Sequence, residues 1–364
     1  MASTHIVRHL RQNVISGGSP QGRFFRHPEP SKRRARVWPV YISFQGCPGR
    51  CVFCAQAVQA GEPPVPLGET LAAMERELAQ AARDGRGPYE LAFYGGVFTA
   101  LPEPWPRRFL EAALRFRRDG LIGRIRCSTR PDACPPGLLA ELAGLGLDLV
   151  EIGAQTFDDA VLAASGRGHD AEATRRAARA VRAAGLDLGL QLLPGLPGHD
   201  PARFARDVAE TCALAPSLVR IHPCLVVAGT QLAALYRAGR YAPWALEETI
   251  EALAQALPSL WRAGAVVARL GLAPQPELEA AILAGPRHPA LGDRARGRAL
   301  LALVREEAAA LGAPVDGLFA PRRFAGQLFG HGGELAQAYA DLGLPRELVR
   351  FTRDEDFFLA AKAV

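Results

Sequence analysis

Short apolar runs alternate with helix-length amphipathic segments from residue 40 to about residue 227. This alternation constrains the fold most strongly, because it is typical of successive βα units that feed a parallel sheet. The runs expected to form strands are PVYISF, ELAFY, RIRCS, LVEIGAQ, LGLQLLP and LVRIHPCLVV. These are too few strands for a closed eight-stranded barrel, so the sequence predicts an α/β fold with an open, partial barrel.

Polar and reactive residues follow these runs directly. In parallel βα folds the reactive groups collect at the carboxyl ends of the strands. The first run leads into a loop with three cysteines, and the second ends at Gly95 and Gly96. The other runs end at or carry Ser128 with Arg130 behind it, Gln155, Gln191 before a PGLPG loop, and His222. We expect these residues to share one rim, although a lone histidine such as His222 is commonly structural.

The pattern changes beyond residue 228. ALEETIEALAQALPSLWRAG predicts a long amphipathic helix, AVVARLGL predicts one further strand, and the remainder reads as helices with a basic centre. We expect three parts: a basic N-terminal arm (1–36), the barrel (37–265) and a small, mostly helical C-terminal domain (266–364). In that last domain, two helices joined by a turn over 330–333 would be KH-like, an arrangement that grips a nucleic-acid backbone.

Positive charge is concentrated in the arm. The chain has a net charge of +6, and residues 1–36 carry eight basic residues against Glu29 alone. Such an arm favours a polyanion such as RNA as a partner, the alternative being an arm packed on the protein's own acidic surface. No run has the length of a membrane span, and the N-terminus lacks a signal-like apolar core, so we expect a cytoplasmic protein without a membrane partner.

Three of the seven cysteines, Cys47, Cys51 and Cys54, have the spacing C-x3-C-x2-C. In a reducing compartment a cluster of cysteines favours metal binding over a disulfide. Structural zinc needs four ligands, usually in two pairs, and the other cysteines are scattered. Thiolates also favour iron–sulfur clusters, where three of them hold three corners of a four-iron cube. One iron then lacks a protein ligand, which leaves a position where a small molecule can coordinate and be reduced.

The loop resembles that of the radical S-adenosylmethionine (SAM) superfamily, whose CxxxCxxC motif follows the first strand of a partial (β/α)6 barrel and has an aromatic residue before its last cysteine, here Phe53. The resemblance implies a 4Fe-4S cluster on Cys47, Cys51 and Cys54, with SAM as the second cofactor. It also implies one-electron cleavage of SAM to a 5'-deoxyadenosyl radical, which abstracts hydrogen from an unactivated carbon. The alternative is three buried or incidental cysteines.

The same resemblance implies roles for the other strand ends. Gly95 and Gly96 match a glycine-rich motif whose backbone contacts the amino group of SAM, where a side chain would block the approach. Other residues resemble those that, in the family, contact the ribose, carboxylate and adenosine of SAM. They are Ser128, Arg130, Gln155, Arg167 and Gln191. Taken singly, several of these also fit a helix cap or a surface ion pair.

Longer stretches narrow the resemblance. STRPD, VEIGAQTFDDAVLAASGRGH, LGLQLLPGLPG and VRIHPCLVVAGTQLAALYRAGRY resemble the radical domain of the Elongator catalytic subunit, a tRNA-modifying enzyme, over about residues 41–241. The sequence departs from that subunit in two ways. The gap between its first two cysteines is narrower, and it has no recognisable acetyl-CoA pyrophosphate loop after residue 265. Stand-alone Elongator-like proteins of bacteria match more closely. They imply an enzyme that acts on RNA, expected to be tRNA, and that needs an electron donor.

Two other functions remain open from the sequence. One is a small-molecule radical SAM oxidoreductase of the oxygen-independent coproporphyrinogen oxidase type, which shares the GLPG segment after the fifth strand. The other is a non-catalytic iron–sulfur module that binds RNA or senses redox state. Salt-dependent affinity for tRNA would favour the RNA-modifying enzyme over the oxidoreductase, because phosphate contacts release counterions.

Overall fold

The computed structural model describes residues 22–30, 36–42, 44–49, 51–56, 65–272 and 275–362. The chain divides into two compact units. The barrel unit comprises Pro30–Thr249 and Ala263–Arg287, and the terminal unit comprises Met1–Glu29, Ile250–Arg262 and His288–Val364. The chain therefore passes from one unit to the other four times, once inside helix α10 (Leu246–Arg262).

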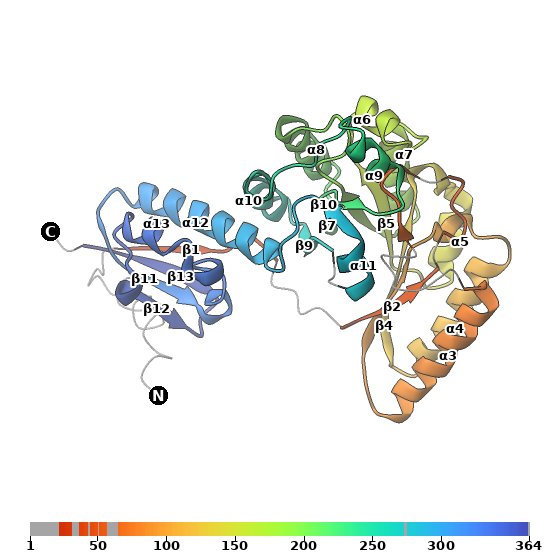
Figure 1. The fold of residues 1–364 in the computed structure, drawn as a ribbon. Helices are drawn as coiled ribbons and strands as arrows, with labels where there is room; N and C mark the ends of the chain where they lie inside the picture. Colours follow the sequence, from red (N-terminus) through yellow and green to blue (C-terminus); the bar gives the residue numbers. More distant parts are fainter. Residues whose placement is uncertain are drawn as a thin grey trace. The chain divides into compact units, whose positions relative to one another are not determined.

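Seven parallel strands form the sheet of the barrel unit, in the order β2-β3-β4-β5-β6-β7-β9 (Figure 1). Because each strand pairs in parallel with the next, all seven carboxyl ends lie along one edge. Strands β2 and β9 form the two sides of the sheet, so the barrel is open. The strands are β2 (Arg36–Tyr41), β3 (Tyr89–Tyr94), β4 (Ile122–Thr129), β5 (Leu149–Gln155), β6 (Asp187–Leu192), β7 (Leu218–Ile221) and β9 (Val266–Leu270).

Helices connect these strands, and aspartates begin two of the longer ones. The side chains of Asp170 and Asp200 accept hydrogen bonds of 2.7 Å from the N–H groups of Ala173 and Arg203, which caps α7 and α8. None of the described helices has the length and apolar composition of a membrane span. The helices are α3 (Leu67–Arg83), α4 (Trp105–Arg118), α5 (Pro136–Gly144), α6 (Asp159–Ala164), α7 (Ala171–Ala183), α8 (Pro201–Ala213), α9 (Gln231–Arg237) and α11 (Pro276–Ala281).

Short elements complete the barrel unit. The 3-10 turns η1 (Phe98–Ala100) and η2 (Pro131–Ala133) follow β3 and β4. Strands β8 (Val226–Val227) and β10 (Ile282–Ala284) pair antiparallel in a separate two-stranded sheet.

The two faces of the barrel sheet differ in polarity. On the outer face, Phe93 packs on Phe98 and Phe109 with ring centroids 4.6 and 5.4 Å apart, and all three side chains are buried. Residues alternate between the faces along a strand, so the neighbours of Phe93 face the interior. Those neighbours include Tyr94, which lines an internal cavity. The apolar core of this unit therefore lies between sheet and helices, and the barrel interior is polar.

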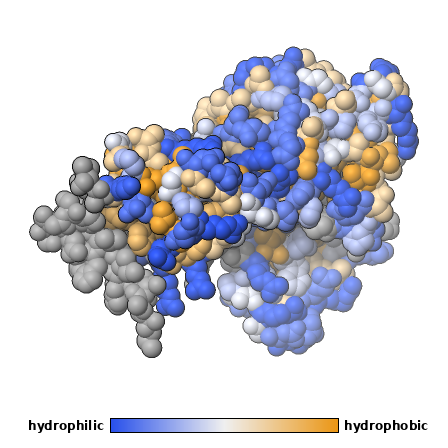
Figure 2. Space-filling model, turned by 60° about the vertical axis from the view of Figure 1, so that its left-hand side comes forward, coloured by the Kyte–Doolittle hydropathy of each residue, from blue (hydrophilic) through white to orange (hydrophobic). Residues whose placement is uncertain are grey.

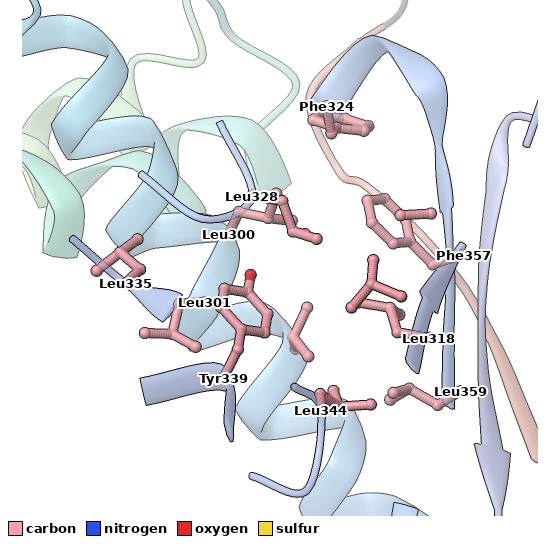
Figure 3. Packing of buried hydrophobic residues seen from close by; sticks show 13 residues of the cluster. Leu300, Leu301, Leu318, Phe324, Leu328, Leu335, Tyr339, Leu344, Phe357 and Leu359 are labelled. Carbon is pink, nitrogen blue, oxygen red and sulfur yellow. The ribbon is translucent and has the colours of Figure 1, made fainter. Parts of the chain in front are cut away.

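The terminal unit contains a four-stranded sheet in the order β1-β13-β11-β12. Its strands are β1 (Gly22–Arg26), β11 (Val315–Pro321), β12 (Val349–Thr352) and β13 (Asp356–Ala361). The long helix α12 (Leu291–Leu311) packs against it, and Figure 3 shows the leucine and aromatic side chains that fill the space between them. Short turns and α13 (Ala336–Ala340) complete the unit: η3 (Arg322–Phe324), η4 (His331–Gly333) and η5 (Arg346–Leu348).

The expected partial barrel of parallel strands is confirmed, and LVEIGAQ matches β5 residue for residue. The expected strand LVRIHPCLVV is divided: its start forms β7, and its end forms β8 in the two-stranded sheet. The further strand expected in AVVARLGL is β9, which pairs with β7 and so belongs to the barrel sheet although it starts at Val266. The sheet of the terminal unit was not expected. Part of the expected arm, Gly22–Arg26, is a strand of that sheet, while residues 1–21 and 31–35 lie outside the described residues.

The expectation of two helices around residues 330–333 is wrong. The segment before the turn forms only η3, and His331–Gly333 is itself a 3-10 turn, so the KH-like pair of helices is not formed there. Gly326 and Gly330 interrupt this segment, and glycine costs about 1 kcal/mol in a helix relative to alanine.

Hydrophobic residues are interspersed among hydrophilic ones on the face of the molecule seen in Figure 2.

Substitution of a core leucine tests the terminal unit. Leu318 on β11 is fully buried, whereas Leu348 in η5 has 36% of its surface exposed. We expect Leu318→Ala to lower the free energy of unfolding of this unit by about 2–5 kcal/mol, because it leaves a cavity. Leu348→Ala should change it by less than about 0.5 kcal/mol. Urea unfolding followed by circular dichroism measures both, and equal effects would contradict the packing described.

Candidate functional site

Backbone hydrogen bonds hold the cysteine loop, residues 42–56, against the rim of the barrel. The Ile42 N–H donates to the Tyr94 carbonyl at 2.8 Å, and the Val97 N–H donates to the Gln45 carbonyl at 2.9 Å. Further along, the Val52 N–H donates to the Ser165 carbonyl at 3.1 Å. The loop is therefore fixed to the ends of β3 and α6 by main-chain contacts that do not depend on a bound group.

The three thiols of this loop differ in their surroundings. Cys51 is buried, and its Sγ accepts a hydrogen bond of 3.2 Å from Arg167. Cys47 donates to the Gly49 carbonyl at 2.8 Å. Burial, together with the neighbouring Cys51 and Cys47, raises the pKa of the Cys54 thiol to about 11. Within the described ranges, no group of three or more histidine, cysteine or acidic side chains is arranged to hold a single metal ion.

All the residues singled out from the sequence for the cluster and for SAM line one cavity of about 520 Å³ in the barrel unit. They come from the cysteine loop, from the ends of β3, β4, β5 and β6, and, for Arg167, from the segment between α6 and α7. These residues are Cys47, Cys51, Phe53, Cys54, Gly95, Gly96, Ser128, Arg130, Gln155, Arg167 and Gln191. The structure thus brings the whole set together, as parallel strand ends require.

The two glycines after β3 lie where the chain leaves no room for side chains. Gly95 has φ +90°, a conformation that favours glycine. A Cβ on Gly96 would lie 2.5 Å from the carbonyl oxygen of Ile42 and closer still to that of Gln45. Gly96 is therefore needed for the close approach of the cysteine loop, a requirement separate from any contact with a cofactor.

The fork of Arg130 is already used within the protein. Its Nε and one Nη donate to the two carboxylate oxygens of Asp132 at 2.9 and 2.8 Å, and the same Nη donates to the Arg167 carbonyl. Burial alone would raise the pKa of Asp132, but the hydrogen bonds and charge of Arg130 bring it below its ordinary value. This geometry favours a positioning role for Arg130, which holds the segment of Arg167, over direct binding of a ligand carboxylate.

Arg167 links the cysteine loop to the end of β5. Besides its bond to Cys51, it donates to the Gly153 carbonyl at 2.6 Å and to His169 at 3.2 Å. Gln155 has φ +67°, which is rare for a residue with a side chain, and its Oε1 accepts a 3.3 Å hydrogen bond from Gln191. Burial and the charge of Arg167 lower the pKa of His169 to about 4. These side chains form a polar wall beside Cys51.

Sequence reasoning missed a second polar group deeper in the cavity. Glu151 lies between Arg126 and Arg220, with ion-pair distances of 3.0 and 2.6 Å. The two guanidinium carbons lie 5.1 and 4.9 Å from the centroid of the Tyr94 ring. All four residues line the cavity. A single charged residue in an otherwise apolar strand, as Glu151 is in LVEIG, was the available signal.

His222 is placed by the same group. Its Nδ1 lies 2.9 Å from the Gly271 carbonyl and its Nε2 lies 2.9 Å from Arg220. The Nδ1–H therefore donates to Gly271 and Nε2 accepts from Arg220, which fixes a neutral ring. Burial and the charge of Arg220 hold the pKa of His222 well below its usual range. His222 is thus a positioning residue for Arg220.

The donor set of the cavity fits a cluster held by three thiolates and a polar ligand with hydrogen-bond acceptors. The thiols of Cys47, Cys51 and Cys54 are the soft ligands that iron–sulfur clusters prefer. Amide and guanidinium donors from Gln191 and Arg167 lie on the adjoining wall. Cys54, neutral at ordinary pH in this state, would lose its proton on binding metal.

Two family models match the chain. Residues 41–210 match the model described as the Radical SAM superfamily, and residues 216–299 match the Radical_SAM C-terminal domain. The first match includes every residue that lines the cavity from the cysteine loop to Gln191, and the second includes Arg220.

The chain is also similar to curated proteins. A tRNA uridine(34) acetyltransferase from Methanocaldococcus jannaschii is 28% identical over 60% of this chain and 48% of its own length. Elongator complex protein 3 from Homo sapiens is 27% identical over 46% of this chain and 34% of its own. The chain thus spans about half or less of the length of these relatives. Among solved structures, Elp3 from Methanocaldococcus infernus shares the fold, with a TM-score of 0.55, 22% identity and coverage of 77% of this chain and 64% of that one.

Adding one methyl group to the glycine turn tests the site. In Gly96→Ala the new Cβ would meet backbone oxygens of the cysteine loop, so the loop must shift. We expect at least a tenfold loss of iron and sulfide uptake during anaerobic reconstitution, without loss of helical circular dichroism. Gly49→Ala, in the cysteine loop itself, is the control, because its Cβ would meet nothing within 4 Å. Equal uptake by both variants would contradict the role given to Gly96.

Proposed function

We propose that this protein, which belongs to the radical SAM superfamily, is an enzyme that modifies RNA, with tRNA as its substrate class. The observation that carries the proposal is the single cavity in which the three cysteines and all the residues expected to bind SAM meet. The name of the curated relative from Methanocaldococcus jannaschii supports the choice of tRNA.

The residues of this chain would divide the work as follows. Cys47, Cys51 and Cys54 would hold a 4Fe-4S cluster, with SAM on its open iron. When bound, this pair supplies one-electron chemistry that activates a C–H bond. Arg167 would orient Cys51 through the 3.2 Å contact to its sulfur. Gln155 and Gln191 would hydrogen-bond the polar parts of SAM, and the buried walls would keep water from the reacting atoms.

Partners and location belong to the same proposal. The enzyme would need an external one-electron donor. A reducing, cytoplasmic location suits a chain whose seven cysteines are all free thiols. The basic arm offers less positive charge for RNA binding than its composition indicates, because Arg23 and Arg26 form ion pairs with Glu307 and Asp356. Its other basic residues, apart from Arg36 at the start of β2, lie outside the described residues, so a role in RNA binding would rest on them.

Removal of one cluster ligand tests the metal assignment. We expect Cys51→Ala to lose the four-iron absorption band and all cleavage of SAM, since two thiolates would remain for the cluster. Cys212→Ala is the matched control, because Cys212 lies on α8 and does not line the cavity. It should keep full iron content. A normal four-iron spectrum in Cys51→Ala would refute the assignment.

Dependence of SAM cleavage on tRNA tests the substrate class. The reconstituted protein is supplied with dithionite and SAM, and 5'-deoxyadenosine is measured with and without bulk tRNA. We expect tRNA to raise the rate severalfold and the effect to weaken with added salt, because phosphate contacts release counterions. Cleavage that is unaffected by tRNA at low salt would contradict RNA as the substrate.

A further inference from the structure

The inner part of the cavity carries an ordered row of polar groups, a donor, an acceptor and a donor. The Glu151 carboxylate is the middle member, and only 1% of the residue is exposed. One of its oxygens accepts from Arg126 at 3.0 Å, and the other accepts from Arg220 at 2.6 Å. The Tyr94 ring, with both guanidiniums about 5 Å from its centroid, holds the two arginines beside it.

This row keeps hydrogen-bonding capacity beyond its internal contacts. A guanidinium has five N–H donors and a carboxylate accepts at about four positions. Arg220 donates one hydrogen bond to Glu151 and one to His222, and Arg126 donates one each to Glu151 and Tyr94. The Nε of Arg126 is buried and forms an ion pair with Glu90 at 3.2 Å, so the donors of Arg126 that remain are the second N–H groups of its two Nη atoms. Donors on both arginines and an acceptor between them therefore remain for a ligand.

A donor–acceptor–donor row complements an imide edge. The Watson–Crick edge of uracil presents a carbonyl, an N–H and a second carbonyl. We propose that Arg126, Glu151 and Arg220 recognise the base of an RNA uridine turned out of its strand into the barrel. The N3–H donates to Glu151, and the two carbonyl oxygens accept from Arg126 and Arg220. This inference rests on the proposed function and assigns the residues that choose the base.

Other ligands fit the row less well. A phosphate or carboxylate would gain from the arginines but would be repelled by Glu151 between them. Cytosine presents an acceptor at N3, so it would face the carboxylate with a lone pair. Guanine has two adjacent donors and could engage Glu151, but it has a single carbonyl on this edge and leaves one arginine without a partner. The row therefore selects uracil among the RNA bases.

The mouth of the cavity offers an aromatic surface to a base on this path. Tyr41, at the end of β2, lines the cavity and has 42% of its surface exposed. Its ring centroid lies 6.0 Å from that of Tyr94. Stacking on aromatic side chains stabilises unstacked bases, which lowers the cost of turning one out of the strand. Tyr41 thus offers an exposed ring beside Tyr94, the residue that contacts both arginines of the row.

Hairpins that differ in a single base test the inference. Three RNA hairpins carry uridine, 3-methyluridine or cytidine at the same loop position, and their affinity for the reconstituted protein is measured by fluorescence anisotropy. The salt concentration is raised until phosphate contacts no longer dominate. We expect 3-methyluridine and cytidine to bind roughly ten- to hundredfold more weakly than uridine, because each leaves the buried carboxylate without its donor. Equal affinity for the three hairpins overturns the inference.

Substitution of Glu151 tests whether the preference for uridine comes from this row. Glu151→Gln should lower the uridine to 3-methyluridine affinity ratio severalfold, because a neutral amide oxygen accepts the N3–H more weakly than a carboxylate does. Glu141→Gln, the same change in a surface residue that pairs with Arg107, should keep the wild-type ratio. A folded Glu151→Gln protein that keeps the full ratio also overturns the inference, and if that variant does not fold, the wild-type comparison still decides.

The outcomes separate this inference from the proposed function. If tRNA raises SAM cleavage and the three hairpins bind equally, RNA remains the substrate and only the assignment of the row fails. If tRNA has no effect and none of the hairpins binds, both fail. A preference for 3-methyluridine or cytidine over uridine contradicts the row alone.

Discussion

Every group in the cavity depends on seven strands that run in one direction. Parallel pairing places their carboxyl ends along one edge, so residues far apart in the chain, such as Cys51 and Gln191, meet there without any contact in sequence. The cysteine loop is attached to this edge by main-chain hydrogen bonds to Tyr94 and Val97. Gly96 permits the attachment because a Cβ at this point would collide with the loop. The sheet thus supplies the geometry of the site before any cofactor binds.

The polar interior of the barrel has an electrostatic cost that its own residues offset. A carboxylate as buried as that of Glu151 would lose several kcal/mol of hydration, and a single removed partner would leave that loss uncompensated. Two arginines compensate the charge, and His222 in turn fixes Arg220. A barrel with an apolar interior would be easier to fold, so the retention of these charges is best explained by recognition of a polar ligand.

The sequence predicted the rim of the barrel better than its interior. Rim residues such as Gln155 and Gly95 lie at the ends of apolar runs, and position at a strand end is a local property. The contacts of Arg130 with Asp132, and of Arg126 with Glu151, depend on which side chains face each other across strands, which one strand alone does not show. The sheet of the terminal unit was missed for a related reason: β12 has four residues, and β1 pairs with β13 from the opposite end of the chain.

The pairing of β1 with β13 has a consequence for the order of folding during synthesis. Arg26 and its partner Asp356 are 330 positions apart, so β1 leaves the ribosome long before β13 exists. At about 5–20 residues per second the interval is roughly 20–70 s, and the strands of the barrel are all translated within it. The phenylalanines of β1 stay without their native neighbours during that time, so this segment is a natural target for chaperones that bind nascent chains.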